Sequence, residues 1–105
     1  MVIGCGTIGL IFILLFKRLY NAKVAAVDID DRKLKTSKKF GVDIAINPIK
    51  ENFREKALGF SNSGFDLIEL TITNKITLNQ SIDLVRDGGC IEVFAGPTSK
   101  KRYRG

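Results

Sequence analysis

The sequence contains no histidine and only two cysteines, and these shortages exclude several kinds of catalytic site. Cys5 and Cys90 lie far apart and neither belongs to a C-x-x-C pair, so the usual ligands of a zinc site are missing. Without a histidine, neither thiol has the neighbouring base that activates a cysteine nucleophile. We therefore expect no catalytic residue and no metal site in this chain. Both cysteines are interpreted as small buried apolar residues, without a disulfide.

Residues 1–16 form a long apolar run, but the run lacks the features of a membrane segment. It is shorter than the roughly 20 residues that a spanning helix needs, and three glycines interrupt it. A secretory signal peptide carries its basic residues before the apolar core, whereas Lys17 and Arg18 come after it. We expect a cytoplasmic location, and we expect no association with a membrane.

The net charge of +6 is concentrated at the end of the sequence. Lys100, Lys101, Arg102 and Arg104 carry four positive charges, and without them the remaining chain has a net charge of +2. No basic face with interleaved aromatic residues and no nucleic-acid-binding motif accompanies these charges. We expect residues 98–105 to form a solvated basic tail, and we expect no nucleic-acid partner.

A glycine-rich motif follows the first apolar residues, since Met1-Val2-Ile3 leads directly into G-C-G-T-I-G at residues 4–9. This order predicts a strand, a tight turn and a helix. In a dinucleotide-binding turn, one glycine makes the turn, one lets the backbone approach a pyrophosphate, and one lets the helix pack closely. The helix N-terminus then offers free N–H groups and a positive dipole end to phosphate oxygens.

An acid follows at the distance expected for ribose recognition. Asp28 ends the apolar run of residues 24–27, which predicts a second strand, and its carboxylate suits the two hydroxyls of an adenosine ribose. The same carboxylate would repel a 2′-phosphate, which favours NAD over NADP. The alternative for Asp28, a helix cap or solvated strand end, is disfavoured by the motif. For Lys33, a ribose contact and an ordinary exposed helix lysine remain equally weighted.

Strands and helices are predicted to alternate along the whole chain with short loops between them. Alternation of this kind indicates right-handed crossovers and a parallel sheet covered on both faces. We predict an α/β fold, a Rossmann-type doubly wound parallel sheet of about five strands in the order 3-2-1-4-5, formed by residues 1–97. The predicted strands are residues 1–3, 23–28, 42–46, 65–71 and 90–95; the predicted helices are 8–20, 30–40, 51–58, and a helix capped by Thr73 or Asn74 and ended by Gly88-Gly89.

Five blocks of the sequence resemble one family when they are taken together and in order. They are V-I-G-C-G-T-I-G-L, V-A-A-V-D-I-D-D-R-K-L, F-G-V-D-I-A-I-N-P, F-D-L-I-E-L-T and L-V-R-D-G-G-C-I-E-V-F-A-G. The chain is similar to the nucleotide-binding domain of the medium-chain, zinc-containing alcohol and polyol dehydrogenases. Within that family it looks closest to the sorbitol, sugar-alcohol-phosphate and threonine dehydrogenase branches.

The resemblance implies a function and a set of cofactor-binding residues. The domain would hold NAD for hydride transfer between an alcohol and the cofactor. Asp28 and Lys33 would lie at the adenosine ribose, and Ile29 against the adenine. Thr71 and Ala95 would border the cofactor cleft. The pyrophosphate would be lined by Gly4, Gly6, Thr7, Ile8 and Gly9.

Three features depart from the family pattern. The domain that supplies the catalytic zinc ligands is missing, so this chain alone is expected to be inactive, as a fragment of the enzyme. The first strand is short and the usual sixth strand is absent, which leaves the fifth as an unprotected edge. Ile72 stands where the family usually has a glycine soon after the fourth strand. We expect it to strain a turn with positive φ or to crowd the cofactor cleft.

The predicted first helix is apolar on all sides from Leu10 to Phe16, although packing against a sheet needs only one apolar stripe. We expect the absent catalytic domain or a second subunit to cover its outward face, and homo-oligomerisation stays open.

Two classes of function remain. The leading hypothesis is the NAD-binding domain of a zinc-dependent alcohol or polyol dehydrogenase, an oxidoreductase. The alternative is a stand-alone NAD-sensing or otherwise non-catalytic Rossmann module. A Rossmann-like methyltransferase is disfavoured by Gly9 and by the later sequence blocks.

Overall fold

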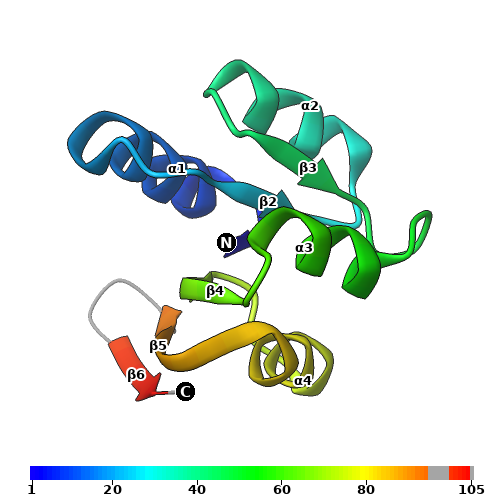
Figure 1. The fold of residues 1–105 in the computed structure, drawn as a ribbon. Helices are drawn as coiled ribbons and strands as arrows, with labels where there is room; N and C mark the ends of the chain where they lie inside the picture. The colour runs from blue at the N-terminus through cyan, green and yellow to red at the C-terminus, as the bar shows by residue number, and fades with distance from the viewer. Residues whose placement is uncertain (95–99, 105) are drawn as a thin grey trace.

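The computed structural model describes residues 1–94 and 100–104 of the chain, with side chains described through residue 94. A central sheet of six strands has the order β3-β2-β1-β4-β5-β6 (Figure 1). The pairs β3–β2, β2–β1, β1–β4 and β4–β5 are parallel. The predicted α/β fold and the strand order 3-2-1-4-5 are therefore confirmed.

Strands and helices alternate from β1 to β5 as the sequence predicts, and β6 follows β5 directly. The strands are β1 (Val2–Ile3), β2 (Ala25–Val27), β3 (Ile44–Ile46), β4 (Phe65–Leu70), β5 (Val85–Phe94) and β6 (Lys100–Arg104). The helices are α1 (Thr7–Tyr20), α2 (Asp31–Lys39), α3 (Phe53–Ser61) and α4 (Lys75–Leu84).

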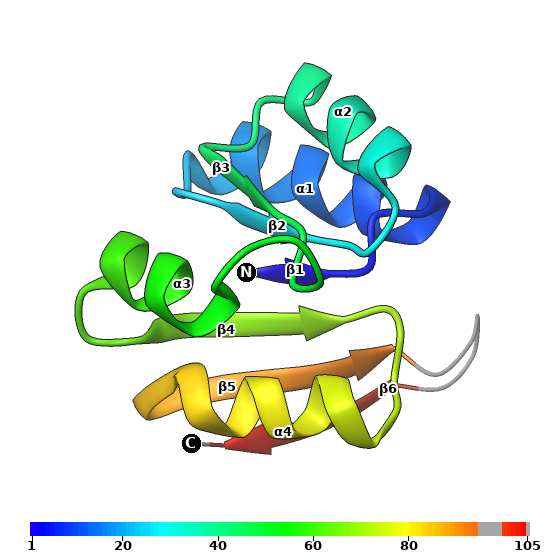
Figure 2. The ribbon, with the colours of Figure 1, turned by 90° about the vertical axis from the view of Figure 1, so that its right-hand side faces the viewer.

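Two hydrophobic cores lie on opposite faces of the sheet. Val2 packs in a cluster with Ile13 of α1 and Leu34 of α2, whereas Ile3 packs in a cluster with Ala57 of α3. The helices accordingly form two layers, with α1 and α2 together and α3 and α4 together (Figure 2). Strands buried on both faces need apolar residues at every position. This requirement explains the short continuous apolar runs from which the strands were predicted.

Side-chain caps begin three of the helices. Asp30 accepts a hydrogen bond from the N–H of Arg32 at the start of α2, and Asn52 accepts one at the start of α3. Asn74 caps α4 through a reciprocal capping box with Thr77, so Asn74 and not Thr73 is the cap. The predicted N-cap chemistry at residue 30 is thus confirmed.

The end of α4 differs from the prediction. The helix ends at Leu84, and the residues from Val85 through the Gly88-Gly89 pair already belong to β5. Gly88 has a φ of +77°, and the β4–β5 register shifts between Phe65 and Leu67. The two glycines therefore lie at an irregularity in the pairing of β4 with β5, and they do not end α4.

The structure also contradicts the expectation that the sixth strand is absent. Residues Lys100–Arg104 form β6, which pairs antiparallel with β5 and sets Arg102 opposite Glu92 in the backbone register. β5 consequently has a neighbour on both sides. The prediction failed because four of the five residues of β6 are basic, a composition typical of a solvated tail. Edge strands also commonly carry charged residues. The boundary expected between residues 97 and 98 lies outside the described residues.

No helix in the described part of the chain is both long enough and apolar enough to cross a membrane.

Candidate cofactor site

The glycine-rich loop connects the carboxyl end of β1 to the start of α1. Gly4 has a φ of +98°, which favours glycine, and its N–H donates to the carbonyl of Val27 at 2.8 Å. A Cβ at this position would overlap the Thr71 hydroxyl and lie 2.8 Å from Cγ1 of Ile72. Gly4 is therefore required both by the turn and by the side chains packed over it.

Gly9 and Gly6 face very different surroundings. A Cβ on Gly9 would overlap the carbonyl oxygen of Gly4, so the close approach of α1 to the loop depends on this glycine. A Cβ on Gly6 would meet no atom within 4 Å. The packing of the chain itself therefore does not explain a glycine at position 6. The open space beside Gly6 fits the second glycine of a dinucleotide-binding turn, which admits a pyrophosphate.

The N-terminus of α1 carries no cap from the described side chains. Gly6 is the N-cap residue, no acidic residue lies in the first turn, and Thr7 and Ile8 are exposed. The first N–H groups of an α-helix have no partner within the helix, and the positive end of the helix dipole lies there. This helix end therefore offers hydrogen-bond donors and a favourable potential to an anion.

Asp28 is almost fully buried, with 5% of its surface exposed, and binds backbone on two sides. Its Oδ2 accepts from the N–H of Cys5 and its Oδ1 from the N–H of Asp30, both at 2.8 Å. The carboxylate thus joins the glycine-rich loop to the end of β2, a role that the sequence did not reveal. A carboxylate has about four acceptor positions, so these two bonds leave capacity for hydroxyl donors.

The side chains of Ile29 and Lys33 lie near Asp28 in the chain and are both exposed. A nearby hydrogen bond from Arg32 lowers the pKa of Asp30, and the charge of Lys33 adds a smaller effect in the same direction. The end of β2 therefore presents an exposed apolar side chain and a mixture of charges around the buried carboxylate.

Cys5 lies inside the glycine-rich loop and is buried. Burial, followed by the negative charge of Asp28, raises the pKa of its thiol to about 12. The thiol therefore stays protonated at neutral pH and is a poor nucleophile, which agrees with its interpretation as a small apolar residue. Among the described residues, no group of three or more histidine, cysteine, aspartate or glutamate side chains is placed to hold a metal ion.

Thr71 directly follows β4 and supports the loop. Its N–H donates to the carbonyl of Ile3 at 3.0 Å, and its hydroxyl lies 2.9 Å from the carbonyl oxygen of Gly4. Thr71 therefore holds the backbone of the glycine-rich loop, and its expected place at the border of the cofactor cleft stays a prediction. Ala95, the other residue expected at the cleft border, lies outside the described residues.

Ile72 does not have the strained backbone that we expected. The non-glycine residues with positive φ in the described chain are Asn21 and Asn62, so the prediction of a strained turn at Ile72 is wrong. Its side chain instead packs over Gly4 and is 43% exposed. A large apolar group therefore lies at the edge of the glycine-rich loop, and the expectation that it crowds the cleft stays a prediction.

The outward face of α1 carries an exposed apolar stripe. Ile8, Ile11, Leu15 and Leu19 recur at helical spacing, and all are exposed, Leu19 to 68%. The excess apolar surface that the sequence predicts on this helix is thus present in the structure.

The fold and the loop together define a class of protein. A doubly wound α/β sheet with a glycine-rich loop after β1 and an acid at the end of β2 is a Rossmann-type dinucleotide-binding domain. A family model described as zinc-binding dehydrogenase matches residues 7–104. The chain therefore belongs to the zinc-binding dehydrogenase family, and the resemblance found in the sequence is confirmed.

Solved dehydrogenase structures share this fold. An alcohol dehydrogenase from Thermus sp. ATN1 is 28% identical, with a TM-score of 0.84 over 93% of this chain and 28% of its own. An Escherichia coli oxidoreductase/dehydrogenase of unknown specificity is 27% identical, with a TM-score of 0.82 over 93% of this chain and 29% of its own. A protein from E. coli CFT073, described as a short chain alcohol dehydrogenase complexed with cofactor NADH, is 25% identical, with a TM-score of 0.80 over 93% and 29%. The chain thus spans less than a third of the length of each.

Proposed function

We propose that this chain is the NAD-binding domain of a zinc-dependent alcohol or polyol dehydrogenase. The observation that carries the proposal is the open space at Gly6, in front of the uncapped N-terminus of α1 and next to the loop held by Asp28. A similar protein was solved with NADH, which supports the choice of cofactor.

The chain's own residues have separate roles in this proposal. Backbone N–H groups at the start of α1, from Thr7 through Gly9, bind the pyrophosphate, because they have no partner within the helix. Asp28 accepts hydrogen bonds from the adenosine ribose hydroxyls through its remaining acceptor positions. Exposed Ile29 covers one face of the adenine, and Lys33 reaches the ribose.

The proposed site distinguishes NAD from NADP by charge. A 2′-phosphate on the ribose would bring negative charge against Asp28, in a buried place where water screens charges poorly. Asp30 follows closely and its pKa is lowered, so this second carboxylate is ionised at neutral pH. We therefore expect a strong preference for NAD.

The chemistry of the complete enzyme requires more than this domain. NAD, when bound, supplies the hydride acceptor, and the role of this chain is to hold and orient it. The described residues provide no set of zinc ligands, so zinc would be held by a catalytic domain outside this chain. We propose that this domain or a second subunit covers the apolar stripe of α1, and that the chain alone is inactive. The free thiols agree with a reducing cytoplasmic location.

Calorimetric titration of the chain with NAD and with NADP tests the proposal. NAD is expected to bind at least tenfold more tightly than NADP, and Asp28→Ala is expected to abolish the difference. Asp66→Ala, which removes an exposed acid paired with Arg86, is the matched control and should leave NAD binding unchanged. Circular dichroism checks that each variant is folded. A folded chain that binds neither nucleotide would contradict the proposal.

The stand-alone NAD-sensing module is the second candidate, favoured by the absence of histidine from the sequence and of any metal-binding group among the described residues. The two candidates differ in their need for a partner. A sensing module keeps its function alone, whereas a dehydrogenase domain gains alcohol oxidation when it is joined to a zinc-bearing catalytic domain of the family.

A further inference from the structure

Asn47 directly follows β3, and it is almost fully buried, with 3% of its surface exposed. The nitrogen of its side-chain amide donates to the carbonyl of Ile29 at 3.0 Å and to Oδ1 of Asp31 at 2.8 Å. The amide oxygen accepts from the N–H of Ile49 at 3.1 Å. Because a carbonyl and a carboxylate only accept and a backbone N–H only donates, the amide is held in one orientation.

The carbonyl of Ile29 and the N–H of Asp30 belong to the same peptide group, and this group is held at both ends. Asn47 donates to its carbonyl, and its N–H donates to Oδ1 of Asp28 at 2.8 Å. A peptide group whose carbonyl accepts a hydrogen bond is polarised, so its N–H becomes a stronger donor. The amide of Asn47 therefore both orients the donor that Asp28 receives and strengthens the bond between them.

This network of hydrogen bonds crosses the carboxyl ends of β3, β2 and β1, which are neighbours in the sheet. Asn47 follows β3, Asp28 follows β2, and Cys5 lies in the loop that follows β1. The N–H of Cys5 donates to Oδ2 of Asp28, the oxygen that the peptide group does not bind. The carboxylate is thus held by the glycine-rich loop on one side and, through one peptide group, by Asn47 on the other. Its remaining acceptor positions therefore point in fixed directions.

We propose that Asn47 is a positioning residue for the adenosine ribose, which acts through the peptide group between Ile29 and Asp30 to aim the carboxylate of Asp28 at the ribose hydroxyls. This inference rests on the proposed function, in which Asp28 binds the ribose. Hydrogen bonds weaken steeply when donor and acceptor are misaligned, so a rotated carboxylate would bind the hydroxyls poorly. A 2′-phosphate gains nothing from this alignment. Loss of the Asn47 amide should therefore reduce the preference for NAD over NADP.

The same side chain also shapes the loop between β3 and α3, so a purely structural role is the alternative. The bond from the N–H of Ile49 to the amide oxygen of Asn47 is an Asx turn, which begins this loop. Asn47→Ser separates the two roles. A serine hydroxyl accepts from the N–H two residues on in the same kind of turn, but it is one bond shorter than the amide and does not reach the carbonyl of Ile29.

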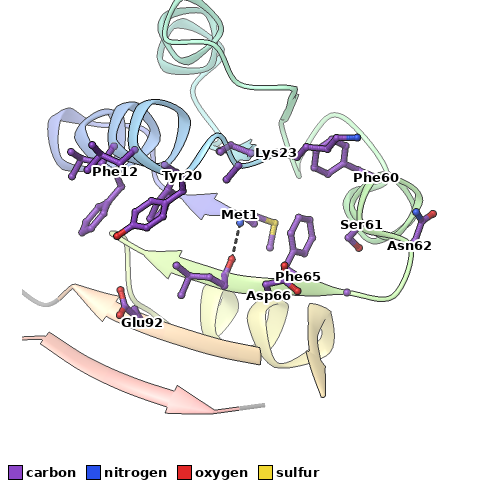
Figure 3. A pocket seen from close by; sticks show the side chains of 17 residues that line it. Met1, Phe12, Tyr20, Lys23, Phe60, Ser61, Asn62, Phe65, Asp66 and Glu92 are labelled. Atoms are coloured by element: carbon purple, nitrogen blue, oxygen red, sulfur yellow. Dashed lines mark hydrogen bonds between the residues drawn. The ribbon is translucent and has the colours of Figure 1, made fainter. Parts of the chain in front are cut away.

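A cavity of about 770 Å³ lies at the other end of the sheet from this network (Figure 3). Its lining includes Met1 before β1, Lys23 before β2 and Phe65 at the start of β4. Neither Asn47 nor Asp28 lines it. A ligand held in this cavity would not contact the network, so a change in nucleotide binding caused by Asn47→Ser reports on the carboxyl ends of the strands.

Calorimetric titration of the chain and of Asn47→Ser with NAD and with NADP is the first measurement. The Kd for NAD is expected to rise about fivefold to tenfold, the size of effect that loss of one hydrogen bond produces. The Kd for NADP should change less than about twofold, so the preference for NAD falls. Asn52→Ala is the matched control, because Asn52 lies in the same loop and caps α3 through the N–H of Glu55. It also costs stability, and it should leave the preference unchanged.

The second measurement needs no cofactor. In the amide NMR spectrum of the chain alone, the proton of the Asp30 N–H should move upfield in Asn47→Ser, because its hydrogen bond to Asp28 weakens. The same proton should exchange faster with solvent. In Asn52→Ala its position and exchange rate should stay as they are in the unaltered chain.

The results separate this inference from the proposed function. An unchanged preference for NAD in folded Asn47→Ser overturns the positioning role and leaves the proposed function standing. An equal loss of NAD and NADP binding, or the same loss of preference in Asn52→Ala, also overturns it, because Asn47 would then act only on the fold. Failure of the unaltered, folded chain to bind NAD overturns both. In that case the Asp30 proton still shows whether Asn47 holds the peptide group.

Discussion

The carboxylate of Asp28 accepts a hydrogen bond from the backbone N–H of Cys5 at 2.8 Å, across 23 residues of sequence. The bond links the end of β2 to the middle of the glycine-rich loop, so the acid proposed to recognise the ribose also holds the loop proposed to bind the pyrophosphate. Both parts of the site therefore depend on one buried side chain. Substitution of Asp28 is expected to affect the stability of the fold as well as the choice of cofactor.

Asp28→Asn tests this double role. One oxygen becomes an amide nitrogen, so one of the two backbone N–H donors loses its acceptor in a buried place. We expect the free energy of unfolding to fall by about 1–3 kcal/mol, measured by urea denaturation. Asp66→Asn, at an exposed pair with Arg86, should change it by less than about 0.5 kcal/mol. Equal effects of the two changes would contradict the structural role of Asp28.

Alanine substitutions in the glycine-rich loop should separate folding from binding. Gly9→Ala places a methyl group onto the carbonyl of Gly4 and should destabilise the fold by several kcal/mol, or prevent folding. In Gly6→Ala the added methyl group meets no neighbouring atom, and the φ of −72° at this position is one that alanine also adopts. The free energy of unfolding should therefore change by less than about 1 kcal/mol. NAD binding should nevertheless weaken at least tenfold, because the methyl group takes the space proposed for the pyrophosphate. Thermal unfolding and calorimetric titration of both variants check this contrast. Unchanged NAD binding in Gly6→Ala would place the pyrophosphate elsewhere.

The sequence predicted the parts of the fold that depend on local patterns. The apolar runs of the first five strands and the polar cap at Asp30 have local physical causes, and the parallel order follows from their alternation with helices. The glycine-rich loop was predicted in the same way, because its glycines are needed locally, either for the turn of the backbone or for the space beside it.

The features that were missed depend on contacts between distant segments. The bond from Cys5 to Asp28 exists only because β1 and β2 pair in one register. β6 was missed because its residues are basic and its pairing is set by β5. The backbone of Ile72 was wrongly expected to be strained, since the family pattern suggests a glycine there while this chain turns without positive φ.

Ile72→Gly should improve cofactor binding if Ile72 crowds the cleft. The side chain lies over Gly4 at the edge of the loop, and its removal opens space on the proposed cofactor side. We expect NAD to bind about threefold to tenfold more tightly by calorimetry, together with a small loss of stability from the added backbone freedom. The matched control is Ile76→Ala, at an exposed isoleucine of α4, and it should leave NAD binding unchanged. Alanine is used in this control because a glycine inside the helix would disrupt α4. Weaker binding in Ile72→Gly would show instead that the isoleucine contributes a favourable contact.

The buried amino group of Met1 predicts how stability depends on pH. Its pKa is lowered from 8.0 to about 5 by burial, so between these values the unfolded chain binds more protons than the folded chain. Stability should therefore rise as the pH increases from 5 to 8, and this contribution is lost as the pH falls through the same range. A difference of about three pKa units corresponds to at most about 4 kcal/mol. Urea denaturation at pH 5, 6, 7 and 8 measures the slope.

N-terminal acetylation isolates this effect, because it removes the titrating group and keeps the chain otherwise intact. Acidic side chains with lowered pKa values, Asp30, Asp31, Asp43 and Glu51, contribute stability that is lost only as the pH falls through their lower range, so they do not account for a slope above pH 6. The acetylated chain should therefore show a nearly flat dependence between pH 6 and 8. An equal slope in both chains would mean that the amino group of Met1 is hydrated in solution.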